Sequence, residues 1–212
     1  MFSFFFFLIH LKILQNVIPL WKELEYYKEY QAKLRSHVGV EKANEIIREA
    51  LYLMSLGTND FLENYYVFPT RRLHYTVSQY QDFLLGIAEN FVRELYALGA
   101  RKLSITGLVP VGCLPLERTT NILGNHGCNE EYNNVALSFN AKLENVITRL
   151  NKELPGLRAL SANAYAIVND IITRPSAYGM CYLLSTLTFF RFHLVCVKDH
   201  NDVIMAYCIC LV

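Results

Sequence analysis

The stretch LYLMSLGTNDFLENYY, residues 51–66, indicates a buried strand that ends in a tight polar turn. Its first six residues are mostly apolar, and GTND at 57–60 then interrupts the run. Polar side chains at the carboxyl end of a strand are where open α/β sheets place ligand-binding groups. An Asn there can donate amide hydrogens to a developing negative charge, so Asn59 is a candidate oxyanion-hole residue. We interpret Asp60 as a turn or helix-cap residue.

The segments on either side of this stretch alternate between strands and amphipathic helices. Apolar residues at helical spacing predict helices at 19–37, 40–50, about 78–98 and 130–154, with a short helix or turn at 166–175. Further strands are predicted at 101–106 and 157–165, and a loop at 69–72. This alternation predicts a parallel sheet with helices on both faces.

Composition and charge exclude some classes of partner. The 212 residues are enough for one domain with a substantial core. The net charge of +1 comes without any basic block, so we expect no nucleic-acid partner. The apolar runs at the two ends are too short or too interrupted by charge to span a bilayer, and we expect no membrane association. The opening run also lacks a basic n-region and a clear cleavage site, so it is not a convincing signal peptide.

Six cysteines are present, and two of them, Cys113 and Cys128, flank a loop rich in Gly, Asn and Pro. They either form a disulfide in an oxidising compartment or remain two free thiols. A disulfide would close a loop of ~15 residues and stabilise the fold by roughly 3 kcal/mol. The other cysteines form no standard zinc pair, and His126 in the loop has no companion ligand, so no metal or other cofactor is expected.

Four motifs occur in order and resemble the plant GDSL esterase/lipase family, within the SGNH hydrolases. They are SLGTNDFLENYY (55–66), LYALGARKLSITGLVPVGCLPLERT (95–119), CNEEYNNVALSFNAKLENVITRLNKELPG (128–156) and SANAYAIVNDIITRPSAYG (161–179). The resemblance covers roughly residues 16–180. It implies a flavodoxin-like, three-layer α/β/α sandwich with a parallel sheet. It also implies a secreted or extracellular hydrolase of small-molecule or lipid carboxylic esters, which forms an acyl-serine intermediate and uses no metal.

The resemblance assigns one catalytic role in this chain. The family takes its nucleophile from a Gly-Asp-Ser block and its base and orienting carboxylate from an Asp-x-x-His block. Its oxyanion hole uses the Ser N–H, a Gly N–H from a second block and the Asn of a Gly-x-Asn-Asp block. Only the last of these blocks occurs here, at 57–60, so Asn59 inherits the oxyanion-hole role.

The nucleophile and the base have no counterpart in the sequence. No Ser follows Gly-Asp, and Ser55 falls inside the predicted strand, where we interpret it as strand filler. No His has an Asp three positions before it. His200 has Asp199 beside it, but adjacent residues on a strand point to opposite faces, so Asp199 is poorly placed to orient that imidazole.

These observations predict an atypical apolar N-terminus at 1–15, a partial hydrolase domain at 16–180 and an atypical apolar tail at 181–212. We expect the chain to be truncated at both ends relative to the family, its fold incomplete and its activity very weak. Three interpretations remain open: an ester hydrolase that has lost its ends, a non-catalytic relative that binds acyl esters or a protein partner, and an unstable fragment. The sequence predicts neither the natural ester nor the oligomeric state.

Overall fold

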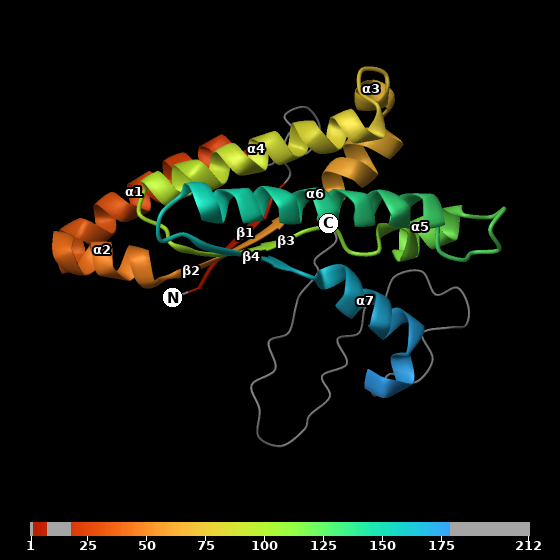
Figure 1. Cartoon of the computed structure of the whole chain (residues 1–212). Coiled ribbons are helices and arrows are strands. Elements are labelled where there is room, and N and C mark those ends of the chain that lie inside the picture. Colours follow the sequence, from red (N-terminus) through yellow and green to blue (C-terminus); the bar gives the residue numbers. More distant parts are fainter. Residues whose placement is uncertain (1, 8–17, 179–212) are drawn as a thin grey trace. The chain divides into compact units, whose positions relative to one another are not determined.

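The computed structural model describes residues 2–7 and 18–178 (Figure 1). The chain divides into two compact units, residues 1–169 and residues 170–212. The described part of the second unit is 170–178, where the Asp170 carboxylate accepts hydrogen bonds from Arg174 at 2.5 and 2.6 Å and from the Tyr178 hydroxyl at 2.6 Å. The tail predicted at 181–212, with Asp199 and His200, lies outside the described residues.

Four parallel strands form the sheet of the first unit, in the order β1-β2-β3-β4. They are β1 (Phe2–Phe7), β2 (Leu51–Leu56), β3 (Lys102–Thr106) and β4 (Arg158–Ala162). The three strands predicted from the sequence are confirmed as β2, β3 and β4. The fourth comes from the N-terminal Phe run, for which we predicted no strand, although aromatic residues suit strands well.

The strand order determines where the crossover helices lie. Each strand pairs with the one before it, so every crossover steps in the same direction along the sheet. Because parallel crossovers are right-handed, such steps place their helices on the same face. Figure 1 shows α4 (Val77–Ala97) and α6 (Glu130–Glu153) side by side along this face. The crossover helices therefore cover one face of the sheet and not both, as the sequence had predicted, because no step reverses direction. The fold class is confirmed as an incomplete α/β sandwich with a parallel sheet.

The remaining elements mostly match the predicted ones. Beside α4 and α6, they are α1 (Leu20–Val38), α2 (Val40–Glu49), the π-helix η1 (Asp60–Val67), α3 (Pro69–Arg72), the 3-10 helix η2 (Val111–Cys113), α5 (Pro115–Thr120), α7 (Ala164–Thr173) and the 3-10 helix η3 (Pro175–Tyr178). Three segments differ. The helices η2 and α5 lie in a region for which no helix was predicted. The turn predicted at 57–60 is a bend at Gly57 followed at once by helix, and the loop predicted at 69–72 is the single turn of α3.

The core lies between the sheet and these helices. Along β2, Tyr52, Met54 and Leu56 are buried under the helices, whereas the alternate residues are half-buried. The Tyr52 hydroxyl lies 2.5 Å from that of Tyr27 on α1 and donates to the Ile47 carbonyl at 2.9 Å, so the buried polar atoms are satisfied. The alternation of buried and half-buried residues along β2 is typical of a strand with one covered face.

Candidate functional site

The carboxyl ends of β2 and β3 are fixed by close backbone packing. Gly57 has a φ of +94°, and a Cβ there would lie 3.2 Å from a Leu108 methyl and 3.5 Å from the Phe139 ring. Gly107, directly after β3, would place a Cβ 2.2 Å from the Asn140 side-chain oxygen. Both positions therefore require glycine, the first for its backbone conformation and the second for space.

Asn140 of α6 fastens the chain that follows β3. Its side-chain oxygen accepts from the Leu108 N–H at 2.7 Å, and its amide group donates to the Leu108 carbonyl at 2.8 Å. One side chain thus satisfies both backbone groups of Leu108, as a neighbouring strand would do. The loop after β3 is held to α6 at this point.

Asn59 lies where the sequence predicted it, just beyond the carboxyl end of β2. Its backbone is helical, with φ −71° and ψ −29°, and the residue is half-buried. The side chain makes no capping hydrogen bond. No hydrogen bond joins its amide to any other residue in the described ranges, so the two N–H donors are available to a ligand.

Asp60 differs from our interpretation of it as a turn or cap residue. It is the first residue of η1 and is completely buried. Its carboxylate accepts from the Asn64 amide at 3.4 Å, and its backbone carbonyl accepts from the Tyr80 hydroxyl of α4 at 3.4 Å. Burial raises the pKa of Tyr80, and Asp60 raises it further, so that hydroxyl keeps its proton. Asp60 thus anchors the segment that carries Asn59.

An aromatic cluster supports the same segment. Phe61 is fully buried, and its backbone N–H donates to the Gly57 carbonyl at 3.0 Å. Its ring packs edge-on against Tyr80 of α4 at 5.5 Å and against Phe139 of α6 at 5.6 Å between centroids. These contacts fix Phe61, two residues after Asn59, against two helices from distant parts of the sequence.

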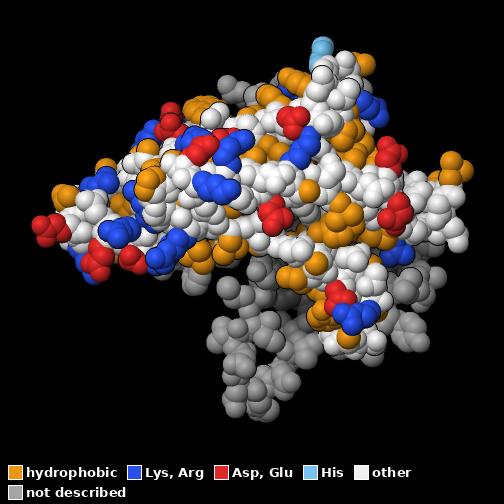
Figure 2. Space-filling view, viewed as in Figure 1, with side chains coloured by type: hydrophobic (Ala, Val, Ile, Leu, Met, Phe, Trp, Pro, Cys, Tyr) orange, Lys and Arg blue, Asp and Glu red, His pale blue; other side chains and the backbone are white. Residues whose placement is uncertain are grey.

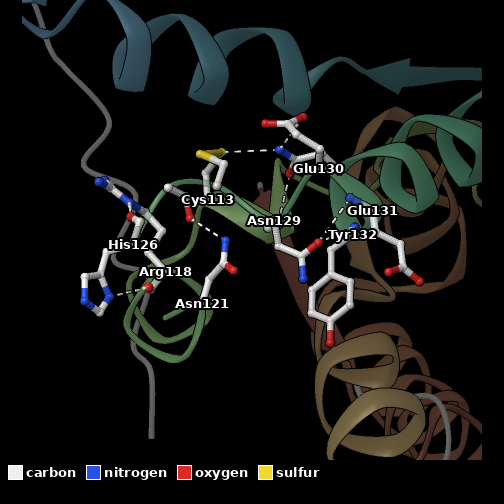
Figure 3. Close-up of a disulfide and its surroundings, with 12 residues drawn as sticks. Cys113, Arg118, Asn121, His126, Asn129, Glu130, Glu131 and Tyr132 are labelled. Atoms are coloured by element: carbon white, nitrogen blue, oxygen red, sulfur yellow. Dashed lines mark hydrogen bonds between the residues drawn. A yellow bond between two sulfur atoms is a disulfide. The ribbon is translucent and has the colours of Figure 1, made fainter. Parts of the chain in front are cut away.

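A disulfide joins Cys113 to Cys128, which confirms the first of the two alternatives drawn from the sequence (Figure 3). Beside it, the Gly112 carbonyl accepts from the Asn129 N–H at 2.8 Å, and the Gly112 N–H donates to the Asn133 side-chain oxygen at 3.0 Å. The Asn133 amide lies 3.4 Å from the Cys113 sulfur. The loop after β3 is therefore fastened to α6 a second time.

Sequence reasoning missed an aromatic pair at the same edge of the sheet. The rings of Tyr66, on η1, and Tyr132, on α6, stack with centroids 3.9 Å apart. The Tyr66 hydroxyl is buried and has no hydrogen-bond partner among the residues that the structure describes, and burial raises its pKa. Burial also raises the pKa of the nearby Glu117 carboxyl. Tyr66 stands inside the first of the four motifs, but only the fold brings Tyr132 to it.

The serines and histidines of the described segments do not form a catalytic pair. Ser3 pairs in register with Tyr52, toward the amino end of the sheet, far along the strand from Asn59. Ser55 lies within β2 opposite Thr106, which agrees with its interpretation as strand filler. Among residues 18–178, no serine hydroxyl is hydrogen-bonded to a histidine ring; the His126 ring instead lies 3.2 Å from the Arg118 carbonyl.

An open hollow lies at the opposite end of the strands. It is lined by residues just before β2 and β3, namely Asn44, Ile47, Arg48, Leu98, Gly99 and Arg101. This hollow lies at the amino ends of the strands, whereas Asn59 lies at their carboxyl ends. We therefore place the candidate site around Asn59 and not in the hollow.

Comparison with known proteins identifies the family. The family model described as GDSL-like lipase/acylhydrolase matches residues 12–183. The chain belongs to this family. This GDSL chain is 54% identical to GDSL esterase/lipase At2g42990 of Arabidopsis thaliana over 165 residues, 78% of this chain and 47% of that protein. It is 57% identical to GDSL esterase/lipase At4g26790 of the same plant over 164 residues, 77% and 47% of the two chains.

The family predicted from the four motifs is confirmed by these matches. The GDSL chain spans about half the length of the curated relatives it matches. The part of it that the structure describes contains no helix that is both long and apolar enough to cross a bilayer. In the same ranges, no three or more His, Cys, Asp or Glu side chains gather as a metal site.

Proposed function

We propose that this chain carries part of a carboxylic ester hydrolase site of the GDSL type, in which Asn59 contributes to the oxyanion hole. One observation carries the proposal. The Asn59 amide stands at the carboxyl end of β2, has no hydrogen-bond partner among the described residues, and belongs to a segment fixed by Asp60 and Phe61. A donor that is fixed in place before the reaction stabilises charge without reorganising.

The chemistry would be acyl transfer to a serine followed by hydrolysis by water. In the tetrahedral intermediates, the ester carbonyl oxygen becomes an oxyanion, and the Asn59 side chain donates an N–H to it. A single side-chain donor of this kind is worth about 10²–10³ in kcat. The substrate class is a small-molecule or lipid ester, as the esterase/lipase names of the relatives suggest.

We further propose that the chain as written hydrolyses esters very weakly. Its 212 residues contain neither a Gly-Asp-Ser nor an Asp-x-x-His sequence. Without the nucleophile and base, the surviving rate enhancement in a comparable triad enzyme is ~10³–10⁴ over water. The alternative role is non-catalytic binding of acyl esters or of a protein partner. The lack of a Gly-Asp-Ser and of an Asp-x-x-His sequence in these 212 residues favours that role as well.

We also propose that residues 16–180 form the hydrolase part of the chain and that the protein works in an oxidising, extracellular compartment. The disulfide between Cys113 and Cys128 supports the compartment, because such bonds persist where thiols are not kept reduced. Mass spectrometry of the protein isolated from plant tissue under alkylating conditions would test it. Free alkylated thiols at both positions would count against the compartment.

Two assays test the proposed function. The chain alone should release little p-nitrophenol from p-nitrophenyl butyrate and should not react with a serine-directed fluorophosphonate. For Asn59, we would replace the matching segment of At4g26790 with that of this chain, and compare the chimera with its Asn59→Ala and Asn134→Ala variants. Asn134 is an exposed control on α6.

The expected result is an active chimera whose kcat falls about 10²–10³-fold in Asn59→Ala, with KM little changed, and stays constant in Asn134→Ala. An inactive chimera, or an Asn59→Ala variant with unchanged kcat, would refute the role of Asn59. Strong hydrolysis by the chain alone that disappears with one serine substitution would refute the proposed weakness.

A further inference from the structure

Large apolar side chains are exposed on two segments beyond the carboxyl ends of β2 and β3. The first segment is 67–74, after η1, and the second is the loop 114–127, which includes α5. The exposed residues are Val67, Phe68, Leu73, Leu116, Ile122 and Leu123. Figure 2 shows apolar atoms at the outermost tip of the structure, where Figure 1 places the loop after α5. The two most distal side chains of that loop, Ile122 and Leu123, are 73% and fully exposed.

The 114–127 loop has a defined structure that holds these side chains outward. The disulfide closes its base. The Asn121 side chain accepts from the Gly124 N–H at 3.1 Å and donates to the Gly127 carbonyl at 3.1 Å. Arg118 donates to the carbonyl of His126 at 3.0 Å, and the loop turns through left-handed backbone at Asn125 and His126 (Figure 3). The exposure of the apolar tip is therefore imposed by the loop's own hydrogen bonds.

The two segments are linked at their bases. Tyr66, the residue before the first segment, stacks on Tyr132, which stands just after the second. Burial raises the pKa of Tyr132, Glu117 and Glu131 raise it further, and Arg72 opposes the rise, so charges of both signs lie near this pair of rings. The two segments thus extend from neighbouring points at one edge of the sheet.

Shape and charge indicate what these segments bind. The apolar groups stand on a projecting loop tip, a shape that suits insertion into a deformable layer. The 67–74 segment carries the exposed Arg72 and no acidic residue, whereas Arg71 is half-buried with its guanidinium over the Phe83 ring. The 114–127 loop carries one charge of each sign, Glu117 and Arg118. Aliphatic side chains beside cationic ones are the combination that binds at the boundary between anionic headgroups and acyl chains.

We propose that the 114–127 loop and the 67–74 segment dock this protein peripherally on an anionic lipid surface. Ile122 and Leu123 enter the headgroup–acyl boundary, and Arg72 faces the anionic headgroups. The inference departs from the absence of membrane association expected from the sequence, which considered only long apolar runs. It goes beyond the proposed function, because docking requires no ester hydrolysis.

Flotation of the chain with lipid vesicles tests this proposal. Vesicles of phosphatidylcholine mixed with phosphatidylglycerol should bind the protein more tightly than vesicles of phosphatidylcholine alone. The double variant Ile122→Ser/Leu123→Ser should reduce the partition coefficient by about tenfold or more, because two aliphatic side chains lose their burial. Val40→Ser, which alters another exposed aliphatic residue, at the start of α2, is the control and should bind as the original chain does.

The charges have their own test. Arg72→Gln should weaken binding to the anionic vesicles by about fivefold and leave binding to phosphatidylcholine unchanged. Lys28→Gln/Lys33→Gln, on exposed positions of α1, should have a much smaller effect. Circular dichroism of each variant should match the original chain, because every substituted side chain is exposed.

A spectroscopic variant keeps the proposal testable in a single protein. In Trp21→Phe/Leu123→Trp, the new indole should shift its emission to shorter wavelength when anionic vesicles are added. The proposal would be overturned if the indole emission did not shift, if the Ile122→Ser/Leu123→Ser variant bound vesicles as tightly as the original chain, or if Val40→Ser lost as much binding as that variant. It would also be overturned if the Ile122→Ser/Leu123→Ser variant lost self-association on gel filtration while its vesicle binding stayed the same, because that would indicate a protein interface.

Discussion

The most informative perturbation is Asn140→Ala, which removes the clamp between α6 and the loop after β3. The Asn140 side chain makes two hydrogen bonds, of 2.7 and 2.8 Å, to the backbone of Leu108, a residue that is completely buried. Each such bond contributes about 1 kcal/mol net, and leaving a buried backbone group unsatisfied raises the cost. We therefore expect the free energy of unfolding to fall by about 2–3 kcal/mol.

The matched control is Asn134→Ala, six residues earlier on the same helix and exposed. Both substitutions gain the same intrinsic helix propensity, so the difference between the two variants isolates the contacts to Leu108. Reversible urea unfolding followed by circular dichroism measures it, as a lower midpoint at an unchanged m-value. Equal midpoints for the two variants would refute the reasoning, because the clamp would then contribute nothing to stability.

The remaining predictions concern the disulfide and two side chains near the site. Cys113→Ser/Cys128→Ser should lower the free energy of unfolding by roughly 3 kcal/mol, and a reducing agent should then have no further effect on the urea midpoint. Asn59→Ala should change stability by less than about 1 kcal/mol, because its amide makes no hydrogen bond among the described residues; a loss of several kcal/mol would contradict that placement. Burial raises the pKa of Glu117, so its neutral form suits the folded protein. As pH rises from the ordinary Glu pKa through the raised one, the free energy of unfolding of the original chain should therefore fall relative to that of Glu117→Gln. A difference between the two proteins that did not change with pH would contradict this prediction.

The long helices and the central strands could be predicted because their signals are local. In α4 and α6, apolar residues recur at helical spacing for five or more turns, and the predicted bounds lie within a residue or two of those observed. β1 could not be predicted, since a run of Phe has neither alternation nor turn signals around it. Its role depends on the exposed edge of β2, which lies about fifty residues away in the sequence.

The candidate site likewise has one part that could be predicted from local sequence and another that could not. The position of Asn59 could be inferred from the strand that precedes it and from the four motifs. What holds Asn59 could not, because Tyr80 and Phe139 come from distant helices. Asp60 was misinterpreted for the same reason: an Asp in a Gly-Thr-Asn-Asp stretch is typical of a turn, and only the fold provides the Asn64 and Tyr80 groups that hydrogen-bond to it in the interior.

The attachment of one helix at several points has a consequence for local unfolding. Asn129, Asn133 and Asn140 bind the chain after β3 at Gly112 and Leu108, and all three belong to α6 or its N-cap. An irregular loop normally opens by itself at little cost, independently of the regular elements around it. We therefore expect the amides of Leu108 and Gly112 to exchange with solvent only when the first turns of α6 open as well. The loop and the helix therefore form one cooperative unit, and the irregular segment shares the protection of a regular one.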